Sequence, residues 1–116
     1  PGWLAAILDP TLSRALLALN DAPARDWSLP ALAQATGTSR SALTARFAQT
    51  LGTSPMRYLR DWRLYLAAES LAATHDPIIT IATGAGYSTE AAFTRAFTRA
   101  YGTPPAEWRR TRARLA

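Results

Sequence analysis

Residues 82–108 are ATGAGYSTEAAFTRAFTRAYGTPPAEW, and they repeat residues 33–58, AQATGTSRSALTARFAQTLGTSPMRY. At an offset of 50 residues the matched positions are Leu43 with Phe93, Phe47 with Phe97, Gly52 with Gly102, Thr53 with Thr103, Pro55 with Pro105 and Tyr58 with Trp108. Ala33 and Gly37 recur 49 residues later as Ala82 and Gly86. Each copy predicts a short helix, a glycine turn and a second helix with apolar residues four apart, which is the helix-turn-helix pattern.

The rest of the chain is also predicted to be helical. Apolar residues recur at three and four positions, Leu and Ala dominate, and no stretch alternates with a period of two. Seven helices are expected. The first three are about 10–20 after an Asp9 N-cap, a short helix between Ser28 and Gly37, and a helix between Ser39 and Gly52. The others are 55–74, about 78–85, one that begins after Ser88 or Thr89 and ends near Tyr101, and 104–115. The expected fold is all-α and homeodomain-like, with two helix-turn-helix subdomains joined by a long central helix.

This pattern divides the chain into segments. Residues 10–54 are predicted to form the first helix-turn-helix subdomain, 55–74 the connecting helix and 75–116 the second subdomain. The chain opens with Pro1 and Gly2 and shows neither an initiator Met nor a signal peptide. We therefore expect residues 1–9 to be a linker from a preceding domain.

Composition excludes several classes of function. The 116 residues contain no Cys and a single His, so disulfides, thiol nucleophiles and Cys-ligated zinc are ruled out. No apolar run reaches the 18 or so residues of a membrane span. Asp9, Asp21 and Asp26 fall in predicted caps and loops, and no glycine-rich phosphate loop is present. We expect no metal, no cofactor, no membrane partner and no enzymatic activity.

Charge is unevenly distributed. All thirteen basic residues are Arg, and the formal net charge is +5. Residues 1–39 hold two Arg against three Asp, a net of −1, whereas residues 40–116 hold eleven Arg against five acids, a net of +6. Such a surplus favours a polyanionic partner, with nucleic acid first and an anionic membrane surface second. A basic surface without such a partner is the simpler alternative.

The second helix of the second repeat carries the strongest single candidate for a base contact, and which repeat contacts more bases is left open. Phe93, Phe97 and Tyr101 define its buried stripe, and Arg95 lies at the centre of the opposite face at 100° per residue. An arginine there can donate two hydrogen bonds to guanine, although a solvated surface arginine is the alternative. Base contacts are expected from Ala91, Ala92, Thr94 and Arg95, and phosphate contacts from Ser88, Thr89, Thr98 and Arg99.

The second helix of the first repeat has a less specific outward face. Leu43, Phe47 and Leu51 are predicted to point inward, and Ala45 occupies the position that matches Arg95. We expect base contacts from small or uncharged side chains, namely Ser41, Ala42, Thr44, Ala45 and Gln49. Phosphate contacts are expected from Ser39, Arg40, Arg46, Arg57 and Arg60.

Other polar and aromatic residues have simpler expected roles. The arginines of the tail, Arg109, Arg110, Arg112 and Arg114, are electrostatic candidates or a frayed basic end. The four tryptophans, Trp3, Trp27, Trp62 and Trp108, are expected to anchor helix packing, and none lies in an Arg–aromatic pattern typical of single-strand binding.

The predicted connecting helix has a useful length. About 20 residues at 1.5 Å each give roughly 30 Å, which approaches the 34 Å or so of one duplex turn. One chain could therefore place two recognition helices, about 39–51 and 89–101, in successive major grooves.

The chain resembles the DNA-binding domain of the AraC/XylS family of bacterial transcription regulators over essentially its whole length. The motifs that carry the resemblance are Ile81-Ala82, Gly86-Tyr87-Ser88, Phe93-Thr94-Arg95-Ala96-Phe97, Tyr101-Gly102-Thr103-Pro104-Pro105 and Trp108-Arg109. Tyr101 stands where Phe is usual, and Trp108 where Tyr is usual. Trp62-Arg63 and the opening Pro1-Gly2-Trp3-Leu4 with Asp9-Pro10 look like the subgroup with an N-terminal cupin-type sensor.

The resemblance implies a role in transcription. It implies sequence-specific binding of double-stranded promoter DNA, RNA polymerase as a further partner, and a small-molecule effector that binds a domain missing from this chain. The fragment itself is expected to be monomeric and cytoplasmic, associated with the nucleoid through DNA. The alternative is a basic helical protein-interaction module without sequence-specific DNA binding.

Overall fold

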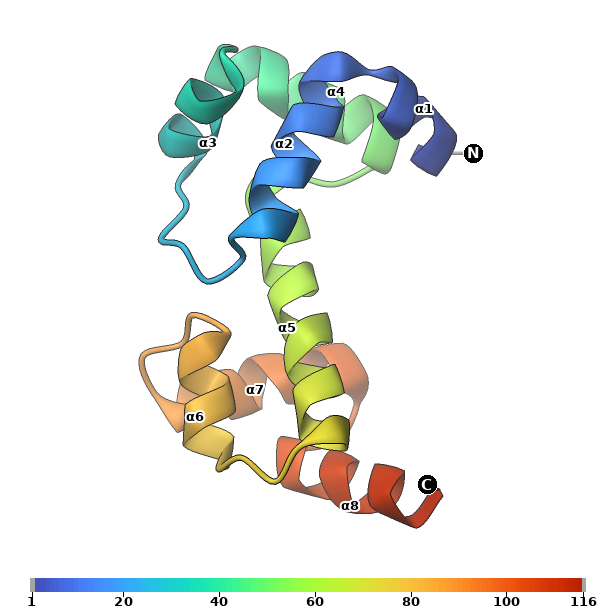
Figure 1. The fold of residues 1–116 in the computed structure, drawn as a ribbon, viewed down its shortest axis with the longest axis vertical. Helices are drawn as coiled ribbons and strands as arrows, with labels where there is room; N and C mark the ends of the chain where they lie inside the picture. Colours follow the sequence, from blue (N-terminus) through green and yellow to red (C-terminus); the bar gives the residue numbers. More distant parts are fainter. Residues whose placement is uncertain (1, 116) are drawn as a thin grey trace. The chain divides into compact units, whose positions relative to one another are not determined.

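The computed structural model describes residues 2–115, without the side chains of Trp3, Ala6, Arg114 and Leu115. The packing role expected of Trp3 and the tail charge of Arg114 therefore lie outside the described residues. The helices (Figure 1) are α1 Gly2–Leu8, α2 Pro10–Asp21, α3 Leu29–Thr36, α4 Arg40–Leu51, α5 Pro55–Ala73, α6 Ile78–Gly84, α7 Glu90–Tyr101 and α8 Pro105–Leu115. Residues 2–115 contain no strand, so the all-α prediction is confirmed.

All seven predicted helices are present, and α1 is an additional one. It ends at Leu8 because Asp9, which precedes Pro10, takes an extended backbone with φ −95° and ψ 109°. The Asp9-Pro10 signal marks the start of α2 and gives no hint that a helix ends directly before it. The assignment of residues 1–9 as a linker from another domain stays a prediction.

Side-chain caps set where the helices begin. Asp9, Ser28 and Ser39 cap α2, α3 and α4 as predicted, each accepting a hydrogen bond from a backbone amide of the first turn. At the start of α7 the sequence left Ser88 and Thr89 open. The structure selects Thr89, whose hydroxyl accepts from the Ala92 amide at 3.1 Å.

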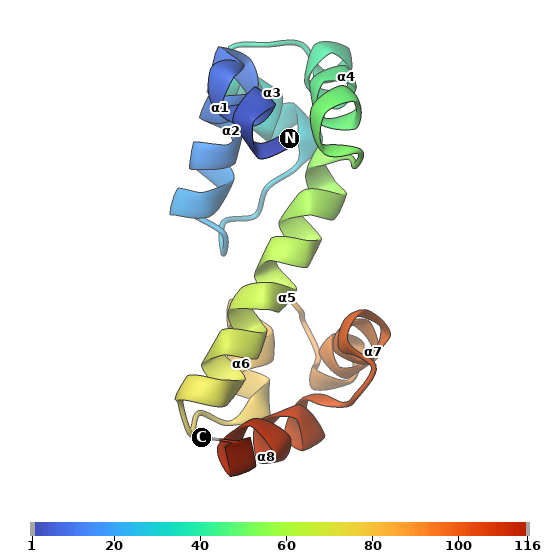
Figure 2. The same cartoon turned by 90° about the vertical axis from the view of Figure 1, so that its right-hand side faces the viewer.

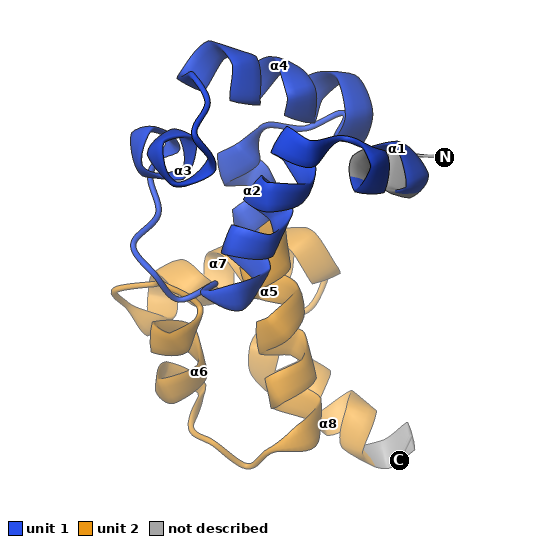
Figure 3. Cartoon of the chain, turned by 45° about the horizontal axis from the view of Figure 1, so that its top comes forward, with its two compact units in different colours: residues 1–60 blue, residues 61–116 orange. Residues whose placement is uncertain are grey.

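The chain forms two compact units, residues 1–60 and residues 61–116 (Figure 3). In unit 1 the hydrophobic core cluster is formed by buried side chains of α2, α3, α4, the first turns of α5 and the loop before α3. They are Leu12, Ala15, Leu19, Trp27, Leu32, Ala33, Leu43, Phe47 and Leu59. The Trp27 ring nitrogen donates to the Ala22 carbonyl at 2.9 Å, so this tryptophan anchors the loop before α3 as well as the core.

Unit 2 is built in the same way from the rest of α5 with α6, α7 and α8 (Figure 2). Its buried side chains are Leu64, Ala67, Ala68, Leu71, Ile81, Ala82, Ala85, Phe93 and Phe97. Phe97 contacts three aromatic rings, those of Phe93, Tyr101 and Trp108, at centroid distances of 5.6, 4.6 and 5.8 Å. The aromatic content of the second repeat thus forms one cluster.

The structure extends the repeat to a third helix. Leu12, Ala15 and Leu19 of α2 are buried, and Leu64, Ala67 and Leu71 of α5 are buried 52 residues later. The later turns of α5 therefore serve unit 2 as α2 serves unit 1. The sequence predicts 55–74 as a separate connector, whereas the division between the units falls inside this helix, at residues 60 and 61.

The two helix-turn-helix turns close in the same manner. Gly37 has φ +68° and Gly86 has φ +90°, a left-handed conformation that costs little only for glycine. Each turn is closed by an amide that bonds back to the small residue of the preceding helix. Thr38 N–H donates to the Ala33 carbonyl and Tyr87 N–H to the Ala82 carbonyl, both at 3.0 Å.

Candidate nucleic-acid interface

The outward face of α7 brings the predicted base-contacting residues together. Phe93 and Phe97 are completely buried, and this fixes which side of the helix faces outward. Ala91 and Arg95 are exposed, while Ala92 and Thr94 are half-buried at the edge of the face. The arrangement agrees with the helical projection made from the sequence.

Arg95 is available for an incoming ligand. In residues 2–115 its guanidinium makes no hydrogen bond, ion pair or ring contact with the protein, and it lies at the centre of the exposed face of α7. A guanidinium offers five N–H donors in a planar fork, which suits guanine and phosphate acceptors. Arg99, one turn further, is exposed too.

The predicted phosphate contacts at the start of α7 are exposed. Ser88 and Thr89 precede the first turn, where backbone amides and the helix dipole favour an anion. Thr98 is different, because its hydroxyl donates to the Thr94 carbonyl at 2.7 Å. Its hydroxyl would have to rotate before it could donate to a phosphate.

The outward face of α4 is made of small and uncharged side chains. Leu43 and Phe47 are completely buried. The predicted base-contacting residues are all exposed: Ser41, Ala42, Thr44, Ala45 and Gln49. Ser39 accepts from the Ala42 amide at 3.1 Å, as Thr89 does from Ala92 in unit 2. The two recognition helices thus share a cap and a core stripe but differ in what they present.

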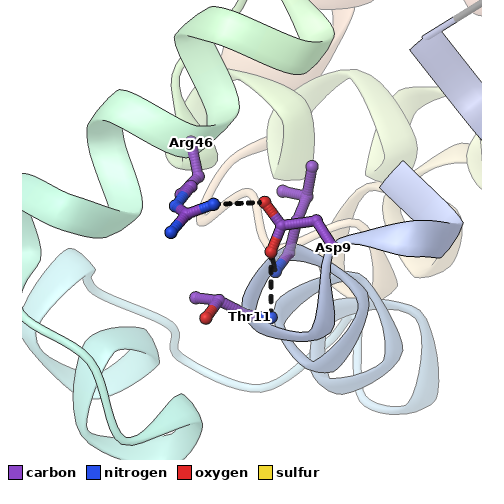
Figure 4. Close-up of polar contacts among 4 residues, drawn as sticks. Asp9, Thr11 and Arg46 are labelled. Atoms are coloured by element: carbon purple, nitrogen blue, oxygen red, sulfur yellow. Dashed lines mark hydrogen bonds and ion pairs between the residues drawn. The ribbon is translucent and has the colours of Figure 1, made fainter. Parts of the chain in front are cut away.

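Arg46 in α4 is held by an ion pair (Figure 4). Its Nη1 lies 3.0 Å from Oδ2 of Asp9. The other carboxylate oxygen of Asp9 accepts from the Thr11 and Leu12 amides at 3.0 and 3.1 Å. The hydrogen bond from Leu12 and the charge of Arg46 lower the pKa of Asp9, against an opposing effect of burial. The ion pair with Arg46 was not predicted from the sequence, which indicates only a capping role for Asp9.

The remaining phosphate candidates of unit 1 lie at helix starts. Arg40 is the first residue of α4, and Arg57 and Arg60 are in the first turns of α5; all three side chains are exposed. Ser54 caps this end of α5, since its Oγ accepts from the Arg57 amide at 3.2 Å. These positions combine positive charge with the amides of a helix N-terminus.

Two arginines expected in a loose basic tail are instead packed in unit 2. Arg109 is half-buried, and its Nε donates to the Leu71 carbonyl at 3.0 Å, near the C-terminal end of α5. Arg112 lies over the Trp108 ring, 3.8 Å from its centroid. The repeat carried a signal for the first, because Arg109 matches Leu59, which is buried. Arg110 is exposed, as expected of a tail charge.

Arg63 is a structural residue that the sequence reasoning missed. A Cβ added to Gly86 would lie 3.1 Å from Nη1 of Arg63. The arginine from α5 therefore packs directly on the turn between α6 and α7. The sequence pointed to Arg63 only through the pair Trp62-Arg63, which is one of the motifs that resemble the AraC/XylS family.

Two kinds of feature are absent from the described residues. Among them, no group of three or more His, Cys, Asp or Glu side chains could hold a metal ion. None of their helices combines the length and the apolar character needed to cross a bilayer.

Comparison with known proteins assigns the family. A family model described as a helix-turn-helix domain matches residues 32–111, which include both repeats. A Streptomyces lividans protein named an AraC-like transcription regulator is 42% identical over 109 residues. The chain belongs to the AraC-type helix-turn-helix family. The alignment covers 94% of this chain and 36% of that relative, so the chain spans about a third of the length of the curated relatives it matches.

Solved structures agree on the fold of this AraC-type domain. A Chromobacterium violaceum transcriptional regulator with an AraC-type DNA-binding domain superposes with a TM-score of 0.86 at 29% identity, covering 92% of this chain and 96% of that one. The DNA-binding domain of AdpA, a global transcriptional factor solved in complex with a target DNA, gives 0.83 over 91% of this chain and 96% of its own. At 24% identity, the likeness to AdpA concerns the fold alone.

Proposed function

We propose that the domain binds double-stranded DNA sequence-specifically, as the DNA-binding part of a bacterial transcription regulator. The observation that carries this function is the unpaired, exposed Arg95 at the centre of the outward face of α7, in the second of two helix-turn-helix units. In such a unit the second helix enters the major groove. An arginine at that point can recognise guanine through O6 and N7.

The two recognition helices have different roles in this proposal. Arg95, with Ala91, Ala92 and Thr94, gives α7 a strong contact with one base pair and apolar contacts beside it. α4 contributes weaker selectivity, through hydrogen bonds of Ser41, Thr44 or Gln49 and methyl contacts of Ala42 or Ala45. We expect the α7 half of the DNA site to be more strictly defined than the α4 half.

The half-sites are proposed to lie in successive major grooves. Half-site centres about one helical turn apart, 10 to 10.5 base pairs, are the spacing expected for two recognition helices in successive major grooves.

Selection of bound duplexes from a random library tests this function directly. We expect an enriched site with two half-sites one turn apart, and a steep loss of affinity with salt. A binder that neutralises about six phosphates has a log–log slope near −5. Failure to enrich any sequence would favour the alternative, a basic module that binds an acidic protein surface.

Phosphate contacts can be separated from base contacts in the same assay. Arg57 is exposed in the first turn of α5, beside the Ser54 cap. Replacing it with Ala should weaken binding to all duplexes and reduce the salt slope by about one. An unchanged slope would remove Arg57 from the DNA footprint.

The length of the relatives supports a proposal for the wider context of the domain. The curated relatives are about three times as long as this chain. We propose that the full protein carries an N-terminal sensor of the cupin type that binds a small-molecule effector. In that arrangement the domain acts on promoter DNA in the cytoplasm, contacts RNA polymerase there, and is monomeric when isolated.

A further inference from the structure

Arg46 is tied to a rigid anchor on another helix. Asp9, its partner at 3.0 Å, has a side chain only 13% exposed. Two backbone amides at the start of α2, those of Thr11 and Leu12, hold the other oxygen of this carboxylate. Asp9 also closes the end of α1, since its own amide donates to the Ala5 carbonyl at 3.1 Å. Because these hydrogen bonds hold the Asp9 carboxylate in one conformation, the ion pair forms only when the Arg46 side chain adopts the conformation that reaches it.

Arg46 retains capacity for a second partner. The side chain is 54% exposed, although its Nη1 is bonded to Asp9. A guanidinium has five N–H donors, and in the described part of the chain only this one bond to Arg46 is found. On α4 the residue follows Ala42 by one turn, which puts it on the flank of the exposed face rather than at its centre.

We propose that Asp9 is a positioning residue for DNA binding, which holds the Arg46 guanidinium at the flank of α4 so that its remaining N–H groups meet a phosphate. This inference rests on the proposed DNA-binding function. A free exposed arginine loses rotamer freedom when it binds, and that loss weakens binding. The pair with Asp9 restricts the arginine beforehand, so less freedom is lost at the phosphate.

Unit 2 has no arginine at the position that matches Arg46. At the offset that relates α4 to α7, Arg46 matches Ala96. At the offset that relates α2 to α5, Asp9 matches Asp61. Unit 2 therefore keeps the carboxylate position and lacks the arginine. A positioned phosphate contact would give α4, which has no arginine on the centre of its exposed face, a fixed placement on the duplex.

The test compares two substitutions that remove the same charge. Asp9→Asn keeps the cap, since Asn is among the best N-cap residues, and removes the ion pair. Asp26→Asn removes a carboxylate from an exposed loop position. Each substitution raises the net charge of the chain by one, so the nonspecific electrostatic attraction to DNA increases equally in the two variants. Using a duplex selected with the unmodified chain, we expect D9N to bind about three to ten times more weakly than D26N.

Arg46→Ala completes the cycle in both backgrounds. We expect it to lower affinity and reduce the salt slope by about one in the unmodified chain, and to have a smaller effect when combined with D9N. Circular dichroism and thermal unfolding at neutral pH check that α2 stays capped. Asp9→Ser, which caps but is too short to reach Arg46, should repeat the D9N result.

Two results would overturn the inference. If D9N binds more tightly than D26N, Asp9 competes with the phosphate for Arg46 rather than positioning it. If D9N and D26N bind equally, or R46A has the same effect in both backgrounds, the pair has no part in binding. The failure of the underlying function is distinct from both, because then the unmodified chain selects no duplex at all.

Discussion

The two units share a framework and differ on the face that α4 and α7 expose. Phe47 and Phe97 are both completely buried, and the cap, the glycine turn and the closing hydrogen bond recur in each unit. At the centre of the exposed face, Ala45 in α4 stands where Arg95 stands in α7. The residues that form the fold are thus separable from those proposed to select DNA, and substitutions in matched positions can measure each set.

The largest effect is expected from truncating the matched phenylalanines. Removal of a buried phenyl ring costs about 3–5 kcal/mol of unfolding free energy. Among the described side chains, Phe97 contacts three aromatic rings, whereas Phe47 contacts one, that of Tyr58, at 6.0 Å. Phe97→Ala should therefore lie at the upper end of that range and Phe47→Ala lower, as measured by urea unfolding.

NMR of each variant locates the loss. Since Phe47 belongs to the core of unit 1 and Phe97 to that of unit 2, each truncation should broaden or shift signals chiefly in its own unit. Equal destabilisation by the two substitutions would show that the aromatic cluster of unit 2 adds nothing beyond the buried ring itself.

The next effect concerns binding rather than folding. Arg95→Ala should weaken binding to the selected duplex by about 1–3 kcal/mol and relax base choice at one position. The matched change in unit 1, Ala45→Gly, removes only a methyl group from an exposed site and should change affinity far less. An R95A variant that loses affinity equally for all sequences would make Arg95 a phosphate contact.

The framework was predictable because it follows from local rules. The N-caps Asp9, Ser28 and Ser39 were predicted, and so were the inward stripes of α4 and α7, since caps and periodicity act within a few residues of the sequence. The repeat supported these predictions, because each cap and each buried position expected in one copy could be compared with the matching position in the other copy.

The remaining features depend on contacts between distant residues. Asp9 and Arg46 are 37 residues apart, and Arg109 and Leu71 are 38 apart. Composition and periodicity carry no information on such pairs. α1 was missed for another reason: residues 2–8, GWLAAIL, contain no polar side chain, so the sequence shows no alternation of apolar and polar faces that would indicate a helix.

A smaller effect is expected at the two turn glycines. An alanine in the left-handed region costs about 1–2 kcal/mol, which sets the expectation for Gly37→Ala, where a Cβ would meet open space. At Gly86 the same Cβ would also displace Arg63. Thermal unfolding should therefore show Gly86→Ala to be the more destabilising of the two, and the difference should shrink when Arg63 is replaced by Ala.

The smallest effect is a pH dependence of stability that arises from Asp9 in unit 1. Because the pKa of Asp9 is lowered in the folded state, its stabilising contribution is present above the unfolded value, about 3.9, and is lost as the pH falls through the folded value. Comparing melting temperatures of the unmodified chain and Asp9→Asn from pH 7 to pH 3 isolates this residue, since all other carboxylates are common to both. The difference in melting temperature between the two proteins should be largest at pH 7 and should shrink toward pH 3. If the difference in melting temperature between the unmodified chain and Asp9→Asn does not change with pH, the charge of Asp9 adds nothing to its role as a cap.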